Sequence, residues 1–192
     1  MLVSGSGTNL QALIDRAGDE SGYQIAVVIS DRPAVRALDR AKAAGIPVAI
    51  VEWTGDRRGF THALCQEALA AEAEALVLAG FMRILGVEAL TRFPHRILNI
   101  HPSLLPAFPG NTPVADTLEH GVWVTGVTVH FIDERVDHGP IVSQEAVAVE
   151  PDDTEFTLHQ RLHAVEHRLY PEAVAALAQG KLTVEDRKVV WS

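Results

Sequence analysis

Short apolar runs alternate with longer amphipathic segments along the first hundred residues of the chain. Apolar runs rich in β-branched residues predict strands, and apolar positions recurring every three or four residues predict helices. The predicted strands are residues 2–3, 24–30, 48–51, 75–79 and 96–100, and the predicted helices are residues 10–17, 34–44, 58–74 and 87–93. Alternating strands and helices build a parallel sheet with helices on both faces, so we predict an α/β fold.

The pattern changes after residue 101. A short helix is predicted at 114–120, and two long, partly alternating segments at 122–132 and 140–149 predict antiparallel strands. A long amphipathic helix over residues 156–179 contains Pro171, which should kink or interrupt it. Short strands at residues 182–184 and 188–190 complete the prediction. No repeat and no Gly/Ser-rich linker divides the 192 residues, which fit one domain.

Composition narrows the class of protein. The chain is 47% hydrophobic and 21% charged, as is typical of globular proteins, and its formal net charge of -9 argues against a general nucleic-acid binder. Cys65 is the only cysteine, and no signal-peptide pattern follows Met1, which together predict a cytoplasmic location. No apolar run has the length that spans a bilayer. We therefore expect neither nucleic acid nor a membrane as a partner.

Asn99 and His101 stand two residues apart at the end of a predicted strand. Residues at this spacing face the same way, and Pro102 should stop the strand directly after them. Open α/β sheets bind ligands at the carboxyl ends of their strands. An amide donor beside a titratable donor suits an oxyanion forming on a carbonyl carbon. The equally weighted alternative is an asparagine that caps a turn and a surface histidine.

The loop from Ser4 to Asn9 joins the first strand to the first helix. Its glycines allow a tight turn, and free N–H groups at a helix start favour a phosphate. Leu10 replaces the third glycine of a dinucleotide fingerprint, and the Lys-Ser/Thr of a triphosphate loop is absent. The loop therefore suits a monophosphate. The alternative is a tight turn with Thr8 or Asn9 as the helix N-cap.

Three further segments have ordinary structural explanations. Residues 78–85 follow a buried strand and could wall a pocket for a flat ring, although a core turn explains them better. Residues 133–137 are an acidic turn, in which Asp137 gains a role only if the fold brings it to His101. The histidines at 159, 163 and 167 have the spacing of a helix face that can bind a divalent metal. No HExxH motif and no convincing carboxylate ligand accompany them, so we predict no metal.

The whole chain resembles glycinamide ribonucleotide formyltransferase, the folate-dependent enzyme family of purine biosynthesis. The resemblance rests on the following segments: SGSGTNLQALID (Ser4–Asp15), AGFMRIL (Ala79–Leu85), NIHPSLLPAFPG (Asn99–Gly110), TGVTVHFIDERVDHGPIVSQ (Thr125–Gln144) and HAVEHRLYP (His163–Pro171). It implies a Rossmann-like formyltransferase fold, a mostly parallel sheet flanked by helices with an antiparallel extension after the catalytic strand. It also implies one domain over residues 1–192, with a nucleotide- and phosphate-binding half (1–100) and a folate-side half (101–192).

The resemblance also implies an activity, the transfer of a formyl group from 10-formyltetrahydrofolate to the amine of glycinamide ribonucleotide. Small molecules would then be the partners, no metal would be required, and a homodimer stays open. The implied catalytic residues are Asn99, His101 and Asp137. The implied ribonucleotide contacts are Gly7, Thr8, Asn9, His163, Ala164, Val165 and Glu166. The implied formylfolate contacts are Arg57, Met82, Arg83, Ile84, Leu85, Asn99, Asp133, Glu134, Arg135, Val136 and Asp137. Asn99 and His101 would stabilise the oxyanion, and Asp137 would favour protonated His101 and relay a proton.

Other readings remain open. A formyltetrahydrofolate hydrolase resembles this core, but usually adds an N-terminal domain and carries His-His where this chain has His101-Pro102. Methionyl-tRNA formyltransferase would need an RNA-binding domain that this chain lacks, and a catalytically silent nucleotide-binding module would not need the three catalytic residues. Relatives commonly have a histidine soon after the active-site Pro-Gly, where this chain has Asn111-Thr112-Pro113. We expect the next helix to start later than in those relatives.

Overall fold

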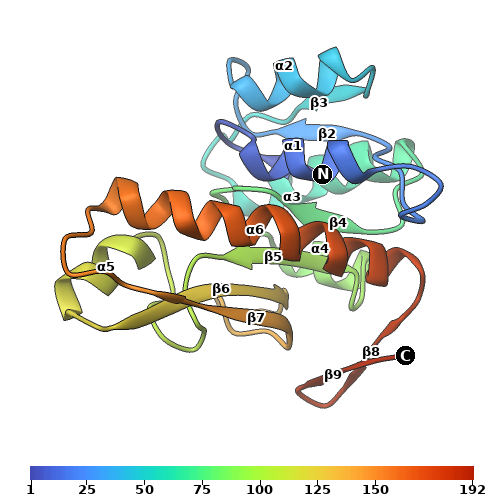
Figure 1. The fold of residues 1–192 in the computed structure, drawn as a ribbon. Coiled ribbons are helices and arrows are strands. Elements are labelled where there is room, and N and C mark those ends of the chain that lie inside the picture. Colours follow the sequence, from blue (N-terminus) through green and yellow to red (C-terminus); the bar gives the residue numbers. More distant parts are fainter.

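One nine-stranded sheet in the order β3-β2-β1-β4-β5-β6-β7-β9-β8 runs through the computed structural model, which describes residues 1–192 (Figure 1). The strands are β1 (Leu2–Val3), β2 (Val28–Ser30), β3 (Val48–Ile50), β4 (Leu76–Leu78), β5 (Ile97–His101), β6 (Val124–Phe131), β7 (Ile141–Ala148), β8 (Leu182–Glu185) and β9 (Lys188–Trp191). The helices are α1 (Thr8–Arg16), α2 (Arg36–Ala43), α3 (Arg57–Ala70), α4 (Val87–Arg92), α5 (Pro113–His120) and α6 (Glu155–Ala178).

The sheet changes character at β5. Strands β1 to β5 are parallel, whereas β6 pairs antiparallel with β5, and β7 pairs antiparallel with β6. The C-terminal hairpin β8–β9 adds to β7 through β9, at one register pair, and extends away from the helices in Figure 1. The predicted α/β class and its antiparallel extension are confirmed. None of the helices combines the length and the apolar character that crossing a membrane requires.

Side chains of successive strand residues enter two separate cores, because alternate residues of a strand face opposite sides of a sheet. Val3, Val77 and Leu98 belong to the core beneath α1, α2 and α6. Leu2, Leu76 and Ile97 belong to the core beneath α3 and α4 on the other face. Figure 1 shows α1 and α6 side by side across one face of the sheet. The sheet is therefore covered on both faces, as predicted.

Three predicted elements differ from the structure. Helix α3 ends at Ala70 and not at residue 74. Strand β2 begins at Val28 and not at residue 24, because its neighbours β1 and β3 are short and pair only with Val28–Ser30. Pro171 does not interrupt α6, which runs as one helix from Glu155 to Ala178. Buried side chains flank the proline on both sides, so tertiary packing holds the helix across the missing backbone donor.

Tyr170 fastens α6 to the centre of the sheet. Its side chain is fully buried, and its hydroxyl lies 2.8 Å from the carbonyl oxygen of Leu78 and 3.0 Å from that of Leu98. Burial raises the pKa of Tyr170 well above its usual value, so the hydroxyl stays a donor. These bonds fix the helix over the junction of β4 and β5, and they set the position of the helical turn that precedes Tyr170.

Replacing Tyr170 with Phe should lower the free energy of unfolding by about 1–3 kcal/mol, because two buried carbonyl oxygens lose their shared donor. Urea denaturation of the variant measures the loss. Tyr23→Phe is the matched control, since the buried Tyr23 hydroxyl donates only to the Leu13 carbonyl oxygen, at 2.8 Å. A loss no larger for Tyr170→Phe than for Tyr23→Phe would mean that Tyr170 does not anchor α6 in this way.

Candidate active site

A cleft of about 530 Å³ opens along the carboxyl ends of β1, β4 and β5. The loop after β1 and the first turn of α1 form one wall, and the N-terminal half of α6 contributes to it. The remaining walls are formed by the loop after β4, the loop between β6 and β7, and the loop after β5 with the start of α5. The cleft therefore lies where an open parallel sheet places its ligand, at the ends of the strands.

Asn99 and His101 both line this cleft from the end of β5, as the alternation of the strand predicts. His101 is buried, and its Nε2 lies 2.8 Å from the carbonyl oxygen of Phe108. A carbonyl oxygen can only accept, so Nε2 carries the proton and donates. The other ring nitrogen, Nδ1, lies 3.5 Å from Oδ2 of Asp137. The alternative of a surface histidine is wrong, and the imidazole has a fixed orientation.

Asp137 reaches this histidine because of the loop that precedes it. The residue has φ 48°, in the left-handed region that few side-chain-bearing residues adopt. Gly139 stands two residues later, and a Cβ there would lie 1.9 Å from the Phe131 carbonyl oxygen, so only glycine permits this close approach. The Asp137 carboxylate also accepts a hydrogen bond from the Gly110 N–H at 2.8 Å. The fold thus meets the condition under which Asp137 gains a role.

His130 is a site residue that the sequence reasoning missed. It stands opposite Asn99 in the antiparallel pairing of β6 with β5. Its Nδ1 donates to the Phe131 carbonyl oxygen at 2.8 Å, which leaves Nε2 as the acceptor for the Asn99 amide at 3.2 Å. Burial, the largest cause, lowers the pKa of His130 below its usual value, so the ring is held neutral. His130 therefore orients Asn99, with Nε2 also 3.7 Å from Oδ1 of Asp137.

One signal could have found His130. It is the only ionisable residue in a strand otherwise made of valine, threonine, glycine and phenylalanine, and it aligns with Asn99 if β6 pairs with β5. That alignment depends on the register between two strands that are about thirty positions apart, which the sequence pattern does not specify.

The loop after β1 presents free backbone donors to the cleft. Gly7 is the N-cap of α1, with φ 71°, and no side chain caps the first turn. A Cβ on Gly7 would lie 2.7 Å from Ala37 Cβ of α2, so the residue is required for the close packing of the loop. The alternative of Thr8 or Asn9 as N-cap is wrong, because Gly7 holds that position. The uncapped N–H groups remain available to an anion.

The Asn9 side chain contacts α6 instead of capping its own helix. Its Nδ2 donates to Oε2 of Glu166 at 2.9 Å, and both side chains are buried. Burial, the largest cause, raises the pKa of Glu166. His163 also lines the cleft, with Nε2 3.9 Å from the same carboxylate oxygen.

Not every residue predicted to contact the ribonucleotide lies in the cleft. Ala164 and Val165 fall outside the residues that line it. The resemblance covers the whole stretch from His163 to Glu166, whereas only residues three or four apart share a helix face. Residues at 159, 163 and 166 follow this spacing, and all three line the cleft.

The predicted folate segments Met82–Leu85 and Asp133–Asp137 line the cleft in full. The Met82 N–H donates to the Ser4 hydroxyl at 3.0 Å, which joins the loops after β4 and β1. Arg57 lies outside the lining, because its guanidinium donates to the Leu85 carbonyl oxygen and supports the loop from behind. Its predicted contact with folate stays a prediction.

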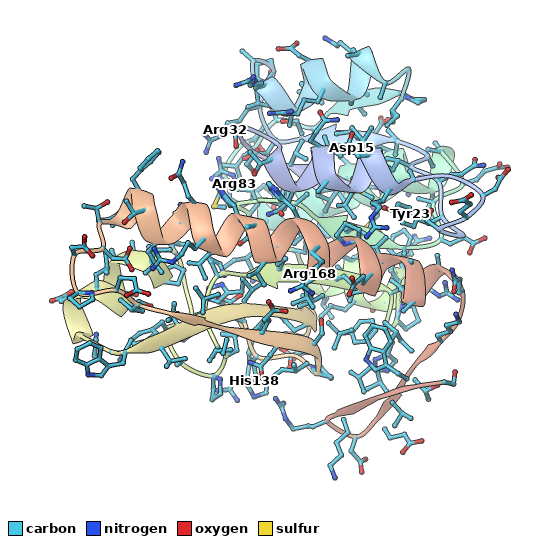
Figure 2. The ribbon with its side chains drawn as sticks, viewed as in Figure 1. Asp15, Tyr23, Arg32, Arg83, His138 and Arg168 are labelled. Carbon is cyan, nitrogen blue, oxygen red and sulfur yellow. The ribbon has the colours of Figure 1, made fainter.

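Arginine side chains gather where β2 and β4 end. Arg83 donates to the buried Asp31 carboxylate at 2.7 Å, and Arg32 lies 3.7 Å from the same oxygen. Figure 2 shows Arg32 and Arg83 close to one another at this end of the sheet. Arg32 lines the cleft although the sequence reasoning did not select it. Elsewhere, no three histidine, cysteine, aspartate or glutamate side chains converge as a metal site would require.

The chain is similar to a family model and to several known proteins. A family model described as formyl transferase matches residues 1–174. The phosphoribosylglycinamide formyltransferase of Mycobacterium tuberculosis is 44% identical over 97% of this chain and 87% of its own length. The human trifunctional purine biosynthetic protein adenosine-3 is 43% identical over 100% of this chain. The chain spans only 19% of the length of that larger protein.

Solved structures agree with these matches. The crystal structure of glycinamide ribonucleotide transformylase 1 from Symbiobacterium toebii has a TM-score of 0.94 and 47% identity, covering 99% of this chain and 91% of the other. A formyltetrahydrofolate deformylase from Pseudomonas syringae has a TM-score of 0.91 at 28% identity. It matches 99% of this chain, which covers 64% of the deformylase. The folds of transferase and deformylase are therefore both similar to this one.

The buried, neutral His130 predicts a pH dependence of stability. An unfolded histidine takes up a proton near pH 6.5, whereas folded His130 resists it, so stability is complete above that pH and is lost as the pH falls. Between about pH 7 and 5, the free energy of unfolding should fall less in His130→Asn than in wild type. The difference between the two slopes is at most about 1.4 kcal/mol per pH unit. Urea denaturation across this range measures the difference. His62→Asn, on the exposed surface of α3, is the control, and equal slopes for wild type and His130→Asn would contradict the assignment.

Proposed function

The chain belongs to the formyl transferase family, and from that premise we propose that it formylates the amine of glycinamide ribonucleotide, with 10-formyltetrahydrofolate as the co-substrate. The products are N-formylglycinamide ribonucleotide and tetrahydrofolate. The observation that carries the proposal is the meeting of Asn99, His101 and Asp137 in one cleft with the uncapped loop at Gly7. The reaction belongs to purine biosynthesis, and we expect it in the cytoplasm, which the single cysteine supports.

The catalytic step follows from the orientation of the two side chains of β5. The substrate amine attacks the formyl carbon, and negative charge develops on the formyl oxygen. The Asn99 amide, held by His130, and the Nδ1–H of protonated His101 are the donors that stabilise this oxyanion. Because Nε2 already donates to the Phe108 carbonyl oxygen, Nδ1 is the nitrogen that faces the reaction.

Asp137 takes up the proton that the amine loses and passes it on to His101. Its Oδ2 lies 3.5 Å from Nδ1 of His101, close enough to exchange a proton with it directly or through water. The attacking amine loses a proton to Asp137 through water, and N10 of the folate leaves with a proton from His101. Asp137 then returns its proton to His101. The bond from the formyl carbon to N10 breaks as the new carbon–nitrogen bond is completed, and no covalent enzyme intermediate forms.

The two substrates approach from different walls of the cleft. The phosphate of the ribonucleotide binds the N–H groups at Gly7, Thr8 and Asn9, and Glu166 meets the glycyl end. The folate pterin binds backbone groups of Met82–Leu85 and of Asp133–Asp137. Met82 and Ile84 are 60% and 55% exposed, so apolar surface is available for the folate to cover.

The deformylase relative makes hydrolysis of formyltetrahydrofolate the second candidate, with water in place of the amine. Incubation with 10-formyltetrahydrofolate, with and without glycinamide ribonucleotide, separates the candidates. Release of tetrahydrofolate only with the ribonucleotide supports the transferase. Release without the ribonucleotide supports the hydrolase, and no release in either case indicates a silent binding module.

His101→Ala should fold normally and lose most of its turnover. Loss of one oxyanion donor typically lowers kcat by about 10²–10³, and loss of proton transfer adds to this. Steady-state formyl transfer measures kcat, and His62→Ala on the exposed surface of α3 controls for removal of a histidine. A folded His101→Ala variant with kcat near that of wild type would rule out the catalytic assignment.

Gly7→Ala should raise KM for the ribonucleotide by roughly tenfold or more, because the added Cβ collides with α2 and strains a residue at positive φ. Gly5→Ala is the matched control in the same loop, since a Cβ there meets nothing within 4 Å. Binding of a folate analogue to both variants should change little. If Gly7→Ala weakens the folate analogue and leaves KM for the ribonucleotide unchanged, the two substrates have been placed the wrong way round.

A further inference from the structure

One wall of the cleft is formed by the segment from Ser4 to Asn9 and by α6. This wall has no lysine or arginine whose charge is free to bind a phosphate. The segment from Ser4 to Asn9 contains no lysine or arginine. The arginines of α6 are engaged elsewhere, Arg161 with Asp153 and Arg168 with Glu145. Arg40 of α2 approaches the loop from outside the cleft, and its Nε donates to the Ser6 carbonyl oxygen at 3.0 Å. A dianionic phosphate bound here would find backbone donors without a cation from α1 or α6.

Two imidazoles of α6 line the same cleft as the loop from Ser4 to Asn9. The rings of His159 and His163 lie 4.2 Å apart, centroid to centroid, and both line the cleft. Glu166 stands at the next position of the same helix face and accepts from Asn9 of the phosphate loop. This bond shows that the face carrying His159 and His163 is turned toward the loop. His167 continues the stripe, with its ring 5.7 Å from His163, but it does not line the cleft.

His159 has no other role in the fold. It is exposed, and neither of its ring nitrogens has a hydrogen-bond or ion-pair partner in the chain. Its neighbour His163 has only the Glu166 carboxylate nearby, at 3.9 Å, and that oxygen already accepts from Asn9. Two adjacent imidazoles with unused donors therefore face the cleft beside an anion-binding loop.

We propose that His159 is a second phosphate ligand, which forms with His163 a paired-imidazole wall that takes up a proton as the phosphate binds. The inference rests on the proposed function only in requiring a substrate that carries a phosphate monoester. It adds to that function a ligand outside the stretch from His163 to Glu166. The two imidazoles therefore carry a positive charge only when the phosphate is bound.

The charges around the pair support uptake of a proton on binding. Desolvation in the cleft wall, followed by the charge of His163, lowers the pKa of His159, and desolvation followed by His167 lowers that of His163. The free pair is therefore neutral at neutral pH, and a dianion beside it favours the imidazolium form.

The other elements that pack around the cleft supply few competing charges. From its own helix, Glu155 and Glu166 face the pair. The remaining acidic groups in the cleft are Asp133, Glu134 and Asp137, and the remaining basic groups are Arg32, Arg83, Arg135, His101 and His130. Helices α1 and α5 contribute only uncharged residues to the lining. Of the fixed cations, Arg32 is the competitor that the test must exclude.

Calorimetric titration with ribose 5-phosphate tests the proposal without any formyl transfer. Titrations at about pH 7.5 in two buffers of different ionisation enthalpy give the affinity and the number of protons taken up. Wild type should take up protons on binding. His159→Asn should bind about tenfold more weakly and take up fewer protons. His159→Lys should restore affinity and also take up fewer protons, because its charge is already present.

Two control variants distinguish phosphate binding by His159 from a structural role of a histidine and from phosphate binding by Arg32. His62→Asn should match wild type, and Arg32→Gln should keep the proton uptake of wild type. Between about pH 7 and 8.5 the phosphate is already dianionic, so affinity should fall with pH in wild type and stay flat in the His159→Asn, His163→Asn double variant.

The proposal is overturned if His159→Asn binds ribose 5-phosphate as wild type does, or binds it more weakly with unchanged proton uptake. It is also overturned if the proton uptake disappears in Arg32→Gln and not in His159→Asn. Because no turnover is read, failure of formyl transfer would leave this result intact, and failure of the imidazole wall would leave the transfer assay intact.

Discussion

The antiparallel pairing of β6 with β5 is the constraint on which the active site depends. It places His130 opposite Asn99 and so gives the asparagine amide an acceptor. It also runs the chain from the carboxyl end of β5 past Asn99 to Phe131, opposite Leu98, and the loop that follows brings Asp137 to within 3.5 Å of His101. A further parallel strand at this position would require a crossover connection and would run in the opposite direction to β6, without this pairing of His130 with Asn99. The change from parallel to antiparallel pairing thus assembles the side chains that the parallel half alone could not.

Local patterns in the sequence were sufficient for much of this arrangement. The period of two along residues 96–101 placed Asn99 and His101 on one face, and the proline after them ended the strand. The glycine-rich loop at Gly7 was also recognisable, because its conformation is a property of a few adjacent residues. Helix and strand ends agreed with the structure to within two residues, apart from the end of α3 and the start of β2. Short neighbouring strands limit the pairing of β2.

Features that depend on distant contacts could not be obtained in the same way. His130 requires the register of two strands, and the continuity of α6 through Pro171 requires the packing around Tyr170. The contact of Asn9 with Glu166 joins residues 157 positions apart, so the sequence suggested capping by Asn9 where the structure has an interhelical bond. Contiguous stretches taken from a resemblance included Ala164 and Val165, because a motif does not distinguish the faces of a helix.

Helix α6 connects these observations, because one helix serves both stability and binding. Tyr170 fixes it to the carbonyl oxygens of β4 and β5, the strands whose ends form the floor of the cleft. From that anchor, the helix extends over the phosphate loop and presents Glu166, His163 and His159 in successive turns. Glu166 is held by Asn9, so the distance between helix and loop is fixed before a ligand binds. The imidazoles beyond it have no such partners, and their charge is therefore free to respond to the ligand. Along this helix face, the held positions Tyr170 and Glu166 lie near the anchor, and the titratable positions His163 and His159 follow toward the start of the helix.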